Sequence, residues 1–196
     1  VIPDPASGGQ SASHPSVERF PILAAPATGN EKNTFRLELI PVACWKLNDV
    51  RFAFNSSFVL PATRSEFVEL ADLRKQHPGA PMSVFGHADP SGDDDFNKTL
   101  SGHRAKSIFA VLVRDVVIWE SLYQSGQNEG WGIASIQEML AAIGQSPGPV
   151  TGSMNSTTKT AVEQFQDRSG LTADGSPGPK TREKLFLAYM DFLSPE

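Results

Sequence analysis

The chain has 196 residues, a formal net charge of −5 and a pI near 5.4, which is enough chain for one large core or two small ones. The acidic balance and the lack of a basic run argue against nucleic-acid binding by counterion release. The sequence contains no run of about 18 consecutive apolar residues, the length that would predict a membrane span. We therefore expect no nucleic-acid partner and no direct membrane insertion.

Residues 1–30 are rich in Pro, Ala, Ser and Gly and show almost no apolar periodicity. This composition is typical of an extended or disordered arm. The first residues also lack the charged-then-apolar layout of a signal peptide. The single cysteine, Cys44, lies in the apolar run 40–45 and excludes an intrachain disulfide. A buried structural thiol is the interpretation that this setting favours.

The pattern changes after residue 31. Apolar residues alternate over 35–39 and recur over 50–54, which predicts two strands. A helix is predicted to begin near Thr63, whose hydroxyl would form a capping box with Glu66, and to end at residues 77–79, His-Pro-Gly.

A third short strand is expected over 82–87, followed by a Gly/Pro/Asp loop and a helix over 95–114. The buried face of that helix is predicted to consist of Ala105, Ile108, Phe109, Leu112 and Val113. Residues 116–123 also have a helical pattern. The order strand, helix, strand, helix predicts a sandwich with helices on one side of a small sheet.

Residues 124–130 break all periodicity and are predicted to be a linker. After it, three short helices are expected in residues 131–196. The first carries Ile133, Ile136, Leu140 and Ile143 and ends at Gly144; the second carries Ala161, Val162 and Phe165 and ends at Gly170; the third begins near Pro179 and carries Leu185, Ala188, Tyr189 and Phe192. We thus expect a domain over 31–123, a linker over 124–130 and a three-helix domain over 131–196.

The most informative stretch runs from Gly86 to Ala105 and resembles the signature of the OmpA-like C-terminal domain. The signature positions are occupied here by Gly86, His87, Ala88, Asp89, Gly92, Asn97, Leu100, Ser101, Arg104 and Ala105. The resemblance covers about ninety residues. It implies an α+β fold, an OmpA-like α/β sandwich with helices on one side of a small mixed sheet, and non-covalent binding of peptidoglycan. Two departures are Ala88, where the family has Thr, and a helical segment where it has a further strand.

The second unit resembles a peptidoglycan-binding-like three-helix domain. The resemblance is carried by Ile136-Gln137, Leu140, Ile143-Gly144, residues 161–166, Gly170-Leu171 and residues 174–181. The chain departs from that family at Met154-Asn155-Ser156. Whether this unit would recognise glycan or peptide stays open.

The first resemblance implies a site for diaminopimelate in the peptidoglycan stem peptide. This amino acid exposes an ammonium and a carboxylate on one carbon, so its pocket needs an anion and a forked cation, which Asp89 and Arg104 would supply. Carrying over the family's contacts adds Asn97, in the loop before Leu100, and Asn55. The structural alternatives are a turn aspartate for Asp89, a solvated helix arginine for Arg104 and a helix cap for Asn97.

No metal or cofactor is expected. His87 and His103 lie near Asp89 without a known ligand spacing, and residues 93–95, three aspartates, suit the positive end of the following helix. No nucleophile elbow, partnered cysteine or zinc hydrolase motif is present, so we expect no enzyme. The chain is interpreted as a wall anchor of the periplasm or cell envelope, associated with the outer membrane. Alternatives are the targeting part of a larger peptidoglycan hydrolase or secreted effector, and an adaptor that docks a protein of an envelope secretion assembly.

Overall fold

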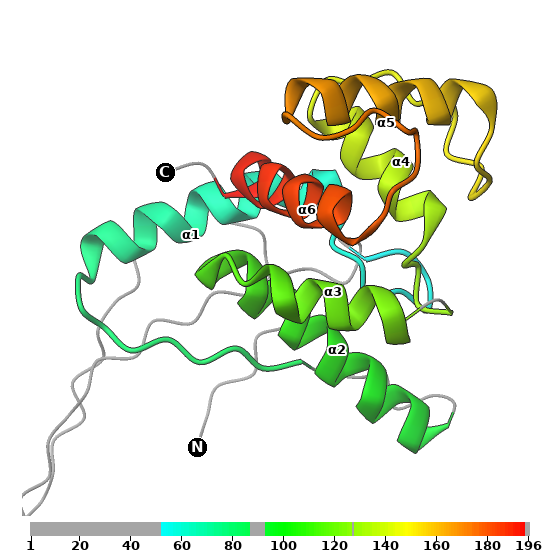
Figure 1. Cartoon of the computed structure of the whole chain (residues 1–196). Coiled ribbons are helices and arrows are strands. Elements are labelled where there is room, and N and C mark those ends of the chain that lie inside the picture. The colour runs from blue at the N-terminus through cyan, green and yellow to red at the C-terminus, as the bar shows by residue number, and fades with distance from the viewer. Residues whose placement is uncertain (1–51, 87–92, 127, 195–196) are drawn as a thin grey trace, which may run out of the picture. The chain divides into compact units, whose positions relative to one another are not determined.

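The computed structural model describes residues 52–86, 93–126 and 128–194 (Figure 1). The expected arm over 1–30, the expected strand over 35–39 and Cys44 lie outside the described residues. The helical elements are η2 (Pro61–Thr63), α1 (Arg64–Gln76), α2 (Asp94–Val113), α3 (Val116–Ser125), α4 (Ile133–Ala142), α5 (Ser156–Arg168) and α6 (Pro179–Leu193). Each predicted helix is present, and α6 begins at Pro179 as expected. None of the helices in these ranges has the length and apolar character needed to cross a membrane.

The small mixed sheet is not seen among the described residues. Their β pairing consists of one isolated antiparallel bridge between Phe52 and Val59. Residues 82–86, the described part of the strand expected over 82–87, have no regular secondary structure, and the side chains of Met82 and Phe85 are 44% and 81% exposed. A strand is stable only when it pairs with a neighbouring strand, and the β pairing recorded among the described residues does not include this segment.

The predicted capping box at Thr63 is wrong. Thr63 is the last residue of η2 and has a helical backbone, with φ −68° and ψ −15°, and its side chain makes no cap hydrogen bond. An N-cap side chain reaches the first turn from an extended backbone, so the preceding 3-10 turn removes the geometry. The caps that do form are acidic or amide side chains at extended positions: Asp93 on α2, Asp115 on α3 and Asn155 on α5.

The predicted buried face of α2 is only partly correct. The buried residues are Leu100, Ser107, Ile108, Ala110 and Val111, whereas Phe109 and Val113 are 44% and 50% exposed. Apolar residues occur on more than one side of this helix, so the periodicity of the sequence did not determine which face of α2 would be buried. The contact with α3 selects the face on which the indole Nε1 of Trp119 donates to the carbonyl of Ser107, at 3.0 Å.

One core joins the residues on the two sides of the expected linker, and residues 47–196 form one compact unit. Helix α6 contacts α1, α3 and α4, as Figure 1 shows. The aromatic side chains at the centre are Phe58, Trp119, Trp131, Phe186 and Tyr189, each at most 3% exposed. Their ring centroids lie between 5.3 and 6.4 Å apart in the contacting pairs, the range in which aromatic pairs attract.

Two buried glutamines organise the loops between α4, α5 and α6. The Gln137 amide donates to the Thr158 hydroxyl at 2.8 Å and accepts from the backbone of Thr151 and Gly152 at 2.9 and 3.0 Å. Gln166 repeats this arrangement in the next loop, donating to the Thr181 hydroxyl at 3.0 Å and accepting from Gly175 N at 2.9 Å. Each amide thereby fixes a loop and the first turn of the following helix.

Candidate functional site

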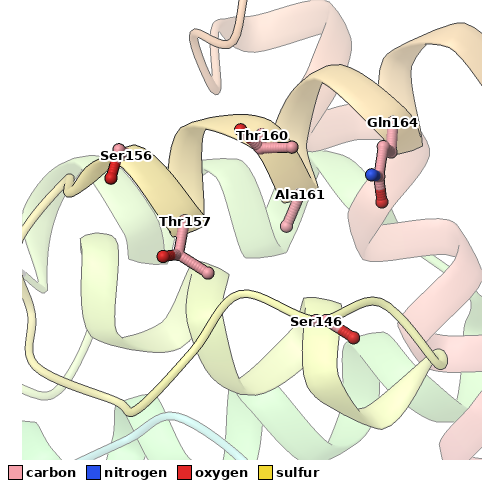
Figure 2. Close-up of a pocket in the computed structure, with 6 residues that line it drawn as sticks. All are labelled: Ser146, Ser156, Thr157, Thr160, Ala161 and Gln164. Carbon is pink, nitrogen blue, oxygen red and sulfur yellow. The ribbon is translucent and has the colours of Figure 1, made fainter.

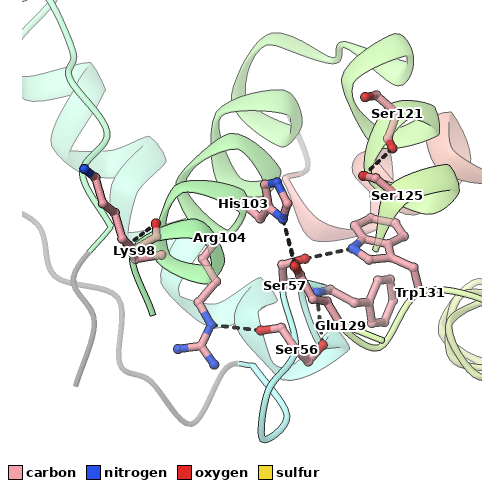
Figure 3. Close-up of polar contacts among 11 residues, drawn as sticks. Ser56, Ser57, Lys98, His103, Arg104, Ser121, Ser125, Glu129 and Trp131 are labelled. Atoms are coloured by element: carbon pink, nitrogen blue, oxygen red, sulfur yellow. Dashed lines mark hydrogen bonds and ion pairs between the residues drawn. The ribbon is translucent and has the colours of Figure 1, made fainter. Parts of the chain in front are cut away.

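Arg104 lies on the third turn of α2 and is half-buried. Its Nε donates to the backbone carbonyl of Ser56 at 2.8 Å, and its guanidinium carbon lies 5.0 Å from the centroid of the Phe52 ring. Figure 3 shows the side chain extending from α2 to Ser56. The segment 52–56 therefore sets the orientation of the guanidinium plane.

Asn55 lies on that same segment. It has φ 51°, in the left-handed region that asparagine tolerates better than most residues, and its side chain is exposed. The turn is closed by Ser56 N, which donates to the carbonyl of Ala53 at 3.0 Å. The structure thus brings Asn55 and Arg104 together, since Asn55 directly precedes the residue that binds the Arg104 side chain.

Asn97 lies on the first turn of α2 rather than in the preceding loop. Its backbone N donates to the carbonyl of Asp93 at 2.9 Å, and Asp93 is the residue that caps the helix. Asp93 is therefore the N-cap of α2, and Asn97 does not have the capping role that was considered for it. Asn97 precedes Arg104 by seven residues, which places the two on the same side of the helix and about 10 Å apart along its axis.

Asp89 lies outside the described residues, so its pairing with Arg104 stays a prediction. The described residues that flank it both lie against α2. Asp93 caps the helix, and Gly86 approaches it so closely that an added Cβ would lie 2.0 Å from the carbonyl oxygen of Ser101. Ser101 is one turn before Arg104, so only glycine allows the chain to pass the helix at this point.

His103 contacts an acidic residue that sequence reasoning missed. Its Nδ1 lies 2.9 Å from each carboxylate oxygen of Glu129, which is 9% exposed (Figure 3). Glu129 belongs to the polar run that was predicted to be a linker, and no local pattern distinguishes it there. Within the described ranges, no three His, Cys, Asp or Glu residues come together as a metal site would require.

A shallow hollow of about 290 Å³ lies on α5 and the loop before it (Figure 2). Its lining consists of Ser146, Ser156, Thr157, Thr160, Ala161 and Gln164. These side chains offer hydroxyl and amide groups without a formal charge, a set suited to a neutral polar ligand. The hollow lies in the second half of the chain, away from the Arg104 contacts.

Comparison with known families confirms the two predicted resemblances and their order. Residues 51–130 match the model described as "OmpA family", and residues 130–185 match the model described as "Putative peptidoglycan binding domain". The first match contains Arg104, Asn97 and Asn55, and the second contains the hollow on α5. The two matches support peptidoglycan binding in general.

Two of the similar proteins are named as outer membrane porins and a third as a probable lipoprotein. Outer membrane porin F of Pseudomonas fluorescens is 36% identical over 86 residues, which cover 44% of this chain and 26% of the porin. Outer membrane porin F of Pseudomonas aeruginosa is 39% identical over 67 residues, or 34% of this chain and 19% of the porin. The Escherichia coli protein named Probable lipoprotein YiaD is 30% identical over 88 residues, or 45% of this chain and 40% of the lipoprotein. The chain therefore spans well under half the length of these relatives, and no solved structure matches it.

Proposed function

We propose that the chain binds peptidoglycan without catalysis, through diaminopimelate in the stem peptide. Asp89 would take the ammonium, Arg104 the carboxylate, and Asn97 and Asn55 would add polar contacts. The observation that supports this assignment best is the contact of Arg104 with the segment of Asn55, inside the OmpA-family match. The arginine is thereby held in one orientation before any ligand arrives.

The chemistry of this pocket predicts weak binding at a single site. A guanidinium donates two parallel hydrogen bonds to a carboxylate, each worth roughly 1.5 to 3 kcal/mol, whereas lysine provides only a compact charge. Association itself costs about 4 kcal/mol or more. A second contact, at the neutral hollow on α5, would raise the avidity for a polymer by about a hundredfold or more.

Neither matched family carries a catalytic description, and the proposed role is anchoring. The names of the relatives support a location in the cell envelope, and we propose that the chain faces the periplasm. Two alternatives compete with this role. One is the targeting part of a larger peptidoglycan hydrolase or secreted effector, and the other is an adaptor that docks a protein of an envelope secretion assembly.

Retention on purified sacculi tests the proposal. Wild-type protein, Asp89→Ala, Arg104→Ala and Arg104→Lys are each mixed with sacculi of the diaminopimelate type and of the lysine type, which lack the second carboxylate. We expect selective retention of the wild type on the diaminopimelate type. Both alanine variants should lose this selectivity, and Arg104→Lys should lose most of the affinity because it cannot form the two parallel bonds.

Arg64→Ala is the matched control for Arg104→Ala. The Nε of Arg64 also donates to a backbone carbonyl, that of Phe192 at 2.9 Å, and its guanidinium carbon lies 5.3 Å from the Phe192 ring. This variant should be retained like the wild type. Equal retention of all variants on both sacculi would assign the binding to the second half of the chain, which contains the hollow on α5. Release of soluble wall fragments would favour the hydrolase. No retention of any variant would favour the adaptor.

A further inference from the structure

The segment Ser56–Val59 connects the proposed binding site to the second half of the chain. All four of its residues are buried, with side-chain exposures of 3% or less. At one end, the Ser56 carbonyl accepts the bond from Arg104 Nε. Ser57 and Val59 form hydrogen bonds with residues that follow α3 in the sequence, and the Phe58 ring packs against two of these residues.

Three hydrogen bonds join this segment to residues that follow α3 in the sequence, one in the expected linker and two after it. Ser57 N donates to the carbonyl of Glu129 at 2.9 Å, the indole Nε1 of Trp131 donates to Ser57 Oγ at 3.0 Å, and the Tyr189 hydroxyl donates to the carbonyl of Val59 at 2.9 Å. Figure 3 shows the Trp131 bond beside the Arg104 contact. The donors of the two side-chain bonds are 3% and 0% exposed, so water does not compete for them.

Ring packing holds the same segment. The Phe58 ring lies edge-on to Trp131 at 5.3 Å and is stacked on Tyr189 at 5.8 Å, with an angle of 17° between the planes. The rings and the hydrogen bonds therefore act on consecutive residues. A shift of Trp131 or Tyr189 would move Ser57 to Val59 and, with them, the carbonyl that orients Arg104.

We infer that Trp131 and Tyr189, which belong to the peptidoglycan-binding-like half and to α6, are positioning residues for the Arg104 pocket. They do not contact the ligand; they hold the segment that carries Asn55 and the Ser56 carbonyl. This inference rests on the proposed function for its effect on affinity. The second half of the chain would then do more than add a second binding site. Through Trp131 and Tyr189 it would also determine how well the Arg104 pocket prefers diaminopimelate to lysine.

The test uses the full chain with the double substitution Trp131→Phe and Tyr189→Phe, which keeps an aromatic side chain at both positions, the smaller phenyl replacing the indole at 131, and removes two hydrogen bonds. Calorimetry measures binding of soluble stem peptides that contain diaminopimelate or lysine, at a temperature where every variant is folded. We expect the affinity for the diaminopimelate peptide to fall about tenfold, as the loss of two ordinary hydrogen bonds allows. The preference over the lysine peptide should narrow by a similar factor. Unchanged affinity and preference would overturn the inference.

Phe165→Leu is the control for lost stability, since Phe165 is buried on α5 away from this segment. This variant should bind both peptides like the wild type.

A second measurement needs no ligand. Solvent exchange of the Arg104 Nε–H, followed by NMR, should become about tenfold faster in the double variant than in the wild type. If the wild type itself fails to bind either peptide, the proposed function is wrong, while faster exchange would still support the positioning role and unchanged exchange would overturn it.

Discussion

Among the residues that the structure describes, two arginines are fixed by the same pair of contacts, a bond from Nε to a backbone carbonyl and a phenylalanine ring beneath the guanidinium. Arg104 makes them with Ser56 and Phe52, and Arg64 makes them with Phe192 alone. These contacts orient a side chain but do not define a ligand site. What distinguishes Arg104 is its setting, next to Asn55 and within the OmpA-family match.

A third arginine, Arg182, makes stability depend on pH. Its Nε and Nη2 donate to the carboxylate of Glu120 at 2.9 and 2.5 Å, and this hydrogen bonding holds the pKa of Glu120 below its ordinary value of about 4.5. A carboxylate with a lowered pKa in the folded state stabilises the fold above the ordinary pKa, and this contribution is lost as the pH falls through the folded value. We expect Glu120→Gln to unfold at lower urea than the wild type at neutral pH, and to lose less stability between about pH 5 and pH 3.

Glu69→Gln serves as the control for that experiment, since Glu69 is an exposed residue of α1. It should follow the wild-type pH profile. Parallel acid profiles for wild type and Glu120→Gln would contradict the prediction.

The resemblance to the loop-to-helix signature selected Arg104 as a candidate, because the signature fixes its spacing from Gly86 and Asp89, and the role of Arg104 in binding stays a prediction. It could not identify the partner. Ser56 is 48 residues away in the sequence and belongs to no motif, and Trp131 and Glu129 were assigned to a new domain and a linker. Contacts between segments so far apart depend on tertiary packing, which leaves no local pattern.

At the scale of elements, the helices were predictable because their signals are local. Pro179 at the start of α6, Gly144 and Gly170 after α4 and α5, and the His-Pro-Gly stop of α1 all act within one turn. The buried face of α2 was not predictable, because Phe109 and Val113 offered a second apolar side and only the position of α3 decides between them. A strand also depends on its partner, so the extended pattern over 82–86 did not ensure a ladder.

The turn between α3 and α4 gives a prediction about glycine. Gly130 has φ +83°, and an added Cβ would lie 2.2 Å from Ser56 Oγ; Gly144 has the same φ of +83°, with nothing within 4 Å. Both alanine variants bear the left-handed strain of about 1 kcal/mol, but only Gly130→Ala must also displace Ser56. Urea unfolding should show Gly130→Ala to be the less stable by at least a further 1 kcal/mol, a typical cost of overpacking. Equal losses would mean that the turn adjusts freely.

At the scale of the whole molecule, the described residues share one core across the two family matches. Phe58 and Trp119 lie within the first match, Trp131 lies within the second, and Phe186 directly follows the end of the second match at residue 185. The division into an OmpA-like domain, a linker and a three-helix domain stays a prediction. Composition could suggest a boundary at 124–130, but it carries no information about the burial of Gly126 and Glu129 there.

A shared core predicts cooperative unfolding in a single step. Trp119 and Trp131 report on the core through fluorescence, and far-UV circular dichroism reports on all the helices. The two urea transitions should coincide, because the loss of α6 exposes aromatic side chains of both halves. Separate midpoints, with the fluorescence change belonging to only one of them, would show that the halves unfold independently.

The hydroxyl of Tyr189 and the carbonyl of Val59, which bond to each other, are 130 residues apart in the sequence. A ribosome makes Val59 long before Tyr189, at roughly 5 to 20 residues per second. During that interval of roughly 6 to 26 seconds the ring of Phe58 lacks its neighbours from α6, so the apolar side chains of Phe58 and Val59 are open to chaperones. The order of synthesis thus gives the cell a period in which the nascent chain is still unfolded around the segment that later orients Arg104.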